Sequence, residues 1–204
     1  MISKPENYEK IPVGGEAIKA GGHKCRIMQA EESMSQRGSQ MLVISFDTTE
    51  DDPQPNYYMA RWVNDKRDRD EKKWGGKMYV VVDGEYGPAN LKRFCTAVED
   101  SNEGFSCWKG NSLDLAGLKN KRVGVVFREE EYRLDDGQCR WSCKGTRFCN
   151  YEKAFEQKIP DPKPLPDSGA SFQPAPMPTA AADGPDYGFV NVADGLEDEG
   201  LPFK

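Results

Sequence analysis

Two segments of this chain combine aromatic and basic side chains in a pattern that could bind a strand of nucleic acid. The residues of the first segment are Tyr57, Tyr58, Arg61, Trp62, Lys66, Arg67, Lys72, Lys73 and Trp74. Those of the second are Tyr132, Arg140, Trp141, Lys144 and Arg147. Cations bind phosphates, and aromatic rings stack on unpaired bases whatever their identity. We therefore predict a single-strand binding site with little sequence preference.

The residue types leave a second interpretation open in both segments. Large aromatic residues are usually buried, so Trp62 and Trp141 could equally belong to a hydrophobic core. The basic run also contains Asp68, Asp70 and Glu71. Mixed charges of this kind favour a solvated loop slightly over a clamp on DNA.

The last ten residues, 195–204, place an acidic cluster before an apolar tip. The residues are Glu197, Asp198, Glu199, Leu201, Pro202 and Phe203. Charge can draw such a tail to a basic partner surface, where its apolar side chains can enter a pocket. A merely solubilising terminus needs no receptor, but it also has no use for an apolar tip. We predict that residues 193–204 bind other proteins.

Patterns typical of catalysis and of metal binding are weak. His23 is the one histidine, and no phosphate-binding glycine motif is present. The spacing of Cys139, Cys143 and Cys149 lacks the two close pairs of a structural zinc site. Cys139, Trp141 and Cys143 alternate as inward-facing strand residues do, so we expect small buried thiols. We predict that the protein is not an enzyme and has no cofactor and no metal site.

The net charge of −6 is concentrated at one end of the chain. Residues 159–204 hold eight acidic and two basic side chains, so residues 1–158 are neutral overall. Phosphate binding depends on the local arrangement of charge, and a neutral body can still present a basic face. The total charge therefore does not exclude nucleic acid as a partner.

Apolar runs are short throughout the chain. None is long enough for a signal peptide or a membrane span, so we expect a soluble, cytoplasmic protein without a membrane partner. Six cysteines in a chain without export signals favour reduced thiols over disulfides.

Proline divides the chain into two parts. Eight prolines fall between residues 159 and 186 among Ala, Gly, Ser and Asp. Such a composition offers too little apolar area to offset chain entropy. We predict a folded domain over 1–158, a disordered linker over 159–192 and the acidic tail over 193–204.

Short apolar segments indicate that the domain is mainly β. Strands are expected at 24–30, 41–46, 57–63, 77–82, 122–128 and 138–148, the last two joined by a turn at Asp136-Gly137. Apolar residues spaced by three and four predict a helix over 88–98, and a shorter helical turn is expected at 113–118. Five or six strands with one or two helices fit a partly open barrel of the OB type, although a sandwich would give similar signals.

Several motifs resemble a known family. The tail looks like the acidic tip of bacterial and phage single-stranded-DNA-binding proteins, in which acids precede an apolar-Pro-Phe terminus. The segments 90–94 (NLKRF), 117–123 (GLKNKRV) and 129–132 (EEEY) are similar to phage-encoded single-stranded-DNA-binding proteins of Gram-positive hosts. The similarity covers most of residues 8–158. Lys204 departs from the pattern, because the family's terminal Phe carries the chain's own carboxylate.

The resemblance implies a function for the whole chain. It implies that the domain binds and protects single-stranded DNA during phage or bacterial replication and recombination, in the cytoplasm of the bacterial host. It also implies that the tail recruits replication and recombination proteins. A protein-interaction adaptor and a strand-annealing protein stay open as alternatives, and so does assembly into a homo-oligomer.

Overall fold

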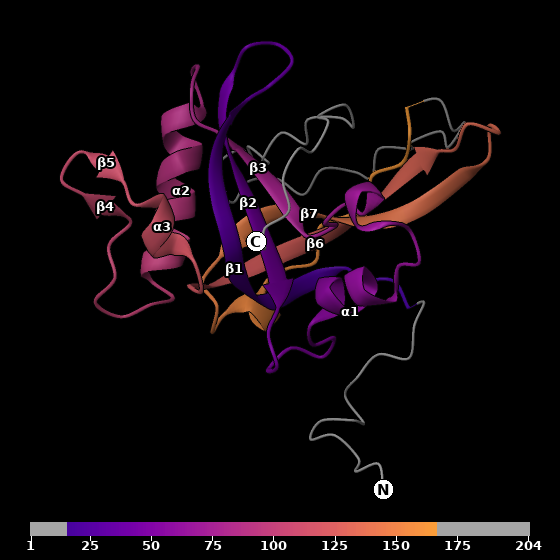
Figure 1. Cartoon of the computed structure of the whole chain (residues 1–204), viewed down its shortest axis with the longest axis horizontal. Coiled ribbons are helices and arrows are strands. Elements are labelled where there is room, and N and C mark those ends of the chain that lie inside the picture. Colours follow the sequence, from indigo (N-terminus) through magenta and orange to yellow (C-terminus); the bar gives the residue numbers. More distant parts are fainter. Residues whose placement is uncertain (1–15, 167–204) are drawn as a thin grey trace, which may run out of the picture.

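The computed structural model describes residues 16–166, in which five strands form one antiparallel sheet (Figure 1). The strands are β1 (Gly21–Met34), β2 (Gln40–Thr48), β3 (Lys77–Val81), β6 (Arg122–Arg133) and β7 (Cys139–Cys149). Their order in the sheet is β3-β2-β1-β6-β7, and β3 and β7 are not hydrogen-bonded to each other. This unclosed, OB-like sheet confirms the predicted fold class.

Helices and a small ribbon occupy the connections between these strands. The helices are α1 (Tyr57–Asn64), α2 (Gly87–Glu99) and α3 (Leu115–Leu118), with 3-10 turns η2 (Arg69–Glu71) and η3 (Ala154–Glu156). Strands β4 (Trp108–Lys109) and β5 (Ser112–Leu113) form a two-stranded ribbon on the far side of the molecule from the β6–β7 hairpin (Figure 1). None of the helices within 16–166 is long and apolar enough to cross a membrane.

The outer half of the β6–β7 hairpin projects away from the barrel (Figure 1). Pairing with β1 covers only the first half of β6, from Arg122 to Phe127, whereas pairing with β7 continues to its end at Arg133. Gly137 in the connecting turn has φ 82°, which agrees with the turn predicted there. Past the end of its pairing with β1, β6 pairs along the same edge with Lys163. The Lys163 N–H donates to the Glu129 carbonyl, and the Lys163 carbonyl accepts the Glu131 N–H. The described part of the predicted linker thus runs along the hairpin.

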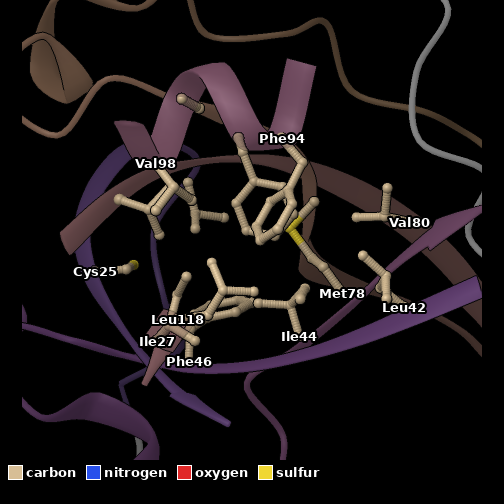
Figure 2. Close-up of a cluster of buried hydrophobic side chains, with 14 of the residues drawn as sticks. Cys25, Ile27, Leu42, Ile44, Phe46, Met78, Val80, Phe94, Val98 and Leu118 are labelled. Atoms are coloured by element: carbon tan, nitrogen blue, oxygen red, sulfur yellow. The ribbon is translucent and has the colours of Figure 1, made fainter. Parts of the chain in front are cut away.

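Helix α2 covers the core of the barrel (Figure 2). The predicted stripe holds, because Phe94, Cys95 and Val98 are buried while Leu91 is half-buried. Figure 2 shows Phe94 and Val98 directed from the helix toward Ile44 and Met78 of the sheet. Full burial of aliphatic and aromatic side chains of this size supplies most of the stabilisation of such a domain.

The strand expected at 57–63 is wrong, because this segment is helix α1. Its aromatic residues have high strand propensity, and for this reason the sequence pattern predicted a strand. Tyr58 and Trp62 are four residues apart, so the helix turns both rings to the same side, toward Trp74. Tertiary packing has therefore overridden the local preference.

The cysteines only partly follow the expectation of small buried thiols. All six are free, and Cys25, Cys95 and Cys107 are buried. Cys139 is exposed and Cys143 is partly exposed, because the outer half of β7 has left the barrel and no longer has an interior to face. Cys149, at the inner end of β7, is partly exposed as well. No group of three or more potential metal ligands occurs in the part of the chain that the structure describes.

Candidate nucleic-acid interface

An open groove with a volume of about 880 Å³ lies between α1 and the β6–β7 hairpin. Helix α1 and the residues after it form one wall, the outer half of β7 forms the opposite wall, and residues 16–18 complete the lining.

Nine of the fourteen predicted nucleic-acid-binding residues line this one groove. They are Tyr57, Tyr58, Arg61, Trp62, Arg67, Lys73, Tyr132, Arg140 and Trp141. The two segments from which they come are separate in sequence, and the fold brings them to facing walls. Their binding role stays a prediction.

The α1 wall carries a cation held against an aromatic ring. The Arg61 Nη1 donates a hydrogen bond of 2.7 Å to the Tyr57 hydroxyl, and its guanidinium carbon lies 5.6 Å from the centre of that ring. Tyr57 itself is buried, so it acts as a fixed support for the exposed arginine. A planar guanidinium supported in this way suits phosphate contacts and stacking.

Trp62 is held on the same wall by two neighbours. The centre of the Trp62 ring lies 6.2 Å from the centre of the Trp74 ring and 5.6 Å from the Lys72 ammonium. The Lys72 ammonium also donates a hydrogen bond to the Trp62 carbonyl at 3.2 Å. Trp62 is half-buried, so it is neither a core residue nor fully exposed.

The hairpin wall carries the more exposed tryptophan. Trp141 is 50% exposed, which decides against a core role for this residue. It is paired across the strands with Glu131, while its neighbour Arg140 is paired with Tyr132. The four consecutive β7 residues 140–143 all line the groove. Because successive strand residues point to opposite faces, residues from both faces of β7 contribute to this wall.

Basic groups outnumber acidic groups in the groove lining. The cations are Arg61, Arg67, Lys73 and Arg140, and the anions are Glu16 and Asp65. Arg67 bonds to Asp65 with a shortest distance of 2.6 Å, and this hydrogen bonding holds the pKa of the Asp65 carboxyl down at about 2. Lys73 and Arg140 form no ion pair with any residue in 16–166. The same holds for Arg61, so these three charges are not neutralised by ion pairs within the described residues.

Residues 16–18 were not expected in the site, and no sequence motif marks them. The Gln54 side chain holds this segment, since its Nε2 donates to the Ala17 carbonyl at 3.0 Å and its Oε1 accepts the Lys19 N–H at 2.9 Å. His23 adds a further tie, because one ring nitrogen lies 3.0 Å from the Lys19 carbonyl and the other 2.9 Å from Asp52. Gln54 lies in a loop more than thirty residues away, and nothing in the sequence around it indicates that it bonds to Ala17 and Lys19.

Five predicted residues do not line the groove. Trp74 is 4% exposed, and its indole N–H donates to the Phe46 carbonyl, so its ring cannot stack on a base. The reason is that the two glycines after Trp74 let the chain pack closely against Phe46 and Tyr58. The other four are Lys66, Lys72, Lys144 and Arg147. Arg147 lies close to the Gln157 side chain instead, at 3.5 Å.

The predicted partner-binding residues of the tail lie outside the part of the chain that the structure describes. The residues concerned are Glu197, Asp198, Glu199, Leu201, Pro202 and Phe203. Their role stays a prediction.

Comparison of this chain with models of protein families gives no match, and comparison with curated protein sequences gives none either.

Proposed function

We propose that this protein binds single-stranded nucleic acid, DNA above all, in the groove between α1 and the β6–β7 hairpin. Binding would be tolerant of sequence and would shield the strand from nucleases and from rewinding during phage or bacterial replication and recombination. The protein would act by binding, without catalysis of its own.

The composition of the groove is the observation that carries this proposal. Lys73, Arg61 and Arg140 supply charges for phosphates, and Trp62 and Trp141 supply rings from facing walls. A duplex hides its bases inside the stack, whereas a single strand offers both its phosphates and its base faces. The combination of rings and cations therefore suits a single strand better than a duplex.

The fold gives independent support. In OB-type barrels, oligonucleotides bind over the second and third strands and the loops at 1–2 and 4–5. The β6–β7 hairpin, which forms one groove wall, corresponds to the connection between the fourth and fifth strands of such a barrel. Helix α1 lies in the connection between the second and third strands. Fold analogy alone does not assign a function, but here it agrees with the chemistry of the groove.

Sequence tolerance follows from the kinds of side chain present. Rings and cations contact features that every nucleotide shares, and hydrogen-bonding side chains that could read a base edge are few. In this groove they are Asn64 and Ser142, apart from the charged and phenolic groups. We expect at most a modest preference among bases.

Recruitment of other proteins belongs to the proposal through the sequence of the tail. Acidic residues followed by Leu201, Pro202 and Phe203 suit a basic, apolar pocket on a replication or recombination protein. Together with the motifs that resemble phage single-stranded-DNA-binding proteins, this favours action in the cytoplasm of a bacterial host cell.

The test is a binding series with fluorescently labelled oligonucleotides. A single strand of thymidines should bind tightly, and a duplex of equal length should bind at least tenfold more weakly. The logarithm of the single-strand affinity should fall with the logarithm of the salt concentration by about 0.7 per phosphate neutralised. Equal affinity for duplex would contradict the proposal.

Truncation after Pro166 separates the remaining alternatives. If residues 1–166 keep their affinity for single strands, the binding site lies in the folded part, as proposed. If neither the full chain nor the truncated chain binds, the protein is an adaptor for its tail. Pairing of complementary strands in an annealing assay would instead identify an annealing protein.

A further inference from the structure

Helix α1 forms one wall of the groove, but its own residues do not cap the N–H groups of its first turn. With eight residues it is too short to be stable alone. Its N-cap residue, Asn56, has left-handed backbone angles (φ 50°, ψ 39°) and makes no side-chain capping bond. The first turn also contains no acidic residue. The N–H groups at its start therefore need partners from elsewhere in the fold.

Two neighbouring residues of β2 supply those partners. The Asp47 Oδ1 accepts the Tyr58 N–H at 2.8 Å, and its Oδ2 accepts the Met59 N–H at 3.0 Å. The Thr48 hydroxyl oxygen accepts the Tyr57 N–H at 2.9 Å. Three consecutive N–H groups of the helix are thus capped from a strand that precedes it in the chain. A carboxylate at this end also interacts favourably with the helix dipole.

Asp47 itself does not line the groove. It is 2% exposed and is absent from the groove lining, whereas the helix it caps provides Arg61 and Trp62. Those two side chains point into the groove only while α1 keeps its position on the barrel. Preorganised binding groups cost less to order when a ligand binds, so the cap bears directly on affinity.

Resting on the function proposed above, we infer that Asp47 is the positioning residue of the nucleic-acid site. By bonding to Tyr58 and Met59 it fixes the α1 wall, and it sets the affinity for single strands without contacting them.

The burial of Asp47 shows how tightly the cap is built into the barrel. The pKa of its carboxyl is raised to about 6, because the effect of burial exceeds the opposing effects of the Tyr58, Met59 and Thr48 N–H groups and of the Arg26 charge. The carboxylate is therefore kept in the interior near neutral pH because these donors surround it. An exposed carboxylate would keep its solvation and would not have its pKa raised by burial.

The experiment compares full-length variants that differ in what they can accept. The substitution D47A removes both oxygens, and D47N keeps one. V98A is the control, because Val98 is fully buried on α2 and its truncation loosens the core without touching α1. Affinity for a thymidine oligonucleotide is measured well below the unfolding temperature of each variant, and amide hydrogen exchange is followed at Tyr58 and Met59.

We expect D47A to bind about tenfold more weakly than the wild type, with faster exchange at both amides. The variant D47N should recover part of the affinity, and V98A should bind within about twofold of the wild type. A merely structural role predicts the same loss for D47A and V98A at equal loss of stability, and that result would overturn the inference. So would an unchanged affinity of D47A with faster amide exchange.

A second variant covers the case in which D47A does not fold. T48V keeps the shape of the side chain but removes the acceptor of the Tyr57 N–H, along with the hydroxyl's hydrogen bond to the Gln54 carbonyl. We expect it to bind single strands more weakly than the wild type, as D47A does. If T48V binds like the wild type while its Tyr57 amide exchanges faster, the inference fails. Should the wild type itself not bind single strands, the proposed function fails first, which distinguishes the two outcomes.

Discussion

The rings of Trp62 and Trp74 lie 6.2 Å apart and inclined by 51°, yet only Trp62 lines the groove. Trp74 is buried behind it and bonded through its indole N–H to the Phe46 carbonyl. The two tryptophans thus differ in position: Trp62 lines the groove, where we propose that it stacks on a base, and Trp74 supports it from the core.

The first prediction separates those tasks. Replacing Trp62 with alanine should lower the affinity for single strands by about 1 to 3 kcal/mol, or about 5- to 150-fold, because one stacking platform is lost. Replacing Trp74 with alanine should instead cost about 3 to 5 kcal/mol of unfolding free energy, because it leaves a cavity in the core. Fluorescence anisotropy and urea denaturation measure the two effects. The reverse pattern would show that the groove wall is misassigned.

The second prediction concerns the hairpin. The substitution W141A should weaken single-strand binding by a similar factor and change stability by less than about 0.5 kcal/mol, because half of the side chain is already exposed. Trp108 is the matched control, being 41% exposed on the β4–β5 ribbon and outside the groove lining. We expect W108A to bind like the wild type. Equal losses for both variants would place the strand elsewhere on the molecule.

The third prediction tests the charges. Each of K73Q and R140Q should reduce the slope of log affinity against log salt by about 0.7, since one phosphate contact is removed. The exposed Lys92 on α2, outside the groove lining, provides the control K92Q, for which the slope should stay as in the wild type. A titration of one oligonucleotide at four salt concentrations measures all three. Slopes that do not change in K73Q and R140Q would exclude these residues as phosphate ligands.

The fourth prediction is a dependence of stability on pH. Burial raises the pKa of Asp47 from 3.8 to about 6. Between about pH 4 and pH 6 the folded protein keeps a proton that the unfolded chain has released, so stability falls as the pH rises through this window. Across this window the free energy of unfolding should fall by about 3 kcal/mol for one such carboxyl group.

The measurement compares the wild type with D47N. Urea denaturation at pH 4, 5, 6 and 7 gives two curves of unfolding free energy, and their difference isolates Asp47 from all other titrating groups. The wild type should lose stability relative to D47N between pH 4 and pH 6 and run parallel to it above that range. Parallel curves at every pH would mean that the carboxyl is solvated rather than buried.

Local patterns were sufficient for most of the barrel. Short apolar segments located β1, β2, β3, β6 and β7, and the Asp136-Gly137 turn located their last hairpin. Spacings of three and four located α2. Helix α1 was missed because the acceptors that cap it, on Asp47 and Thr48, belong to another element and leave no mark beside Tyr57.

The sequence by itself determined which kinds of side chain could meet a nucleic acid, because rings and cations are properties of residues. It also determined a mainly β domain with a helix, since strand and helix periodicities follow from the backbone. The OB-like arrangement, as opposed to a sandwich, was decided by the tertiary structure. Only the tertiary structure decided which of those residues share a site. Trp62 and Trp141 face one groove because the chain reverses through the barrel, whereas Trp74, beside the same basic run, is drawn into the core. The physical reason is that burial and proximity are set by packing between distant segments, which local sequence does not encode.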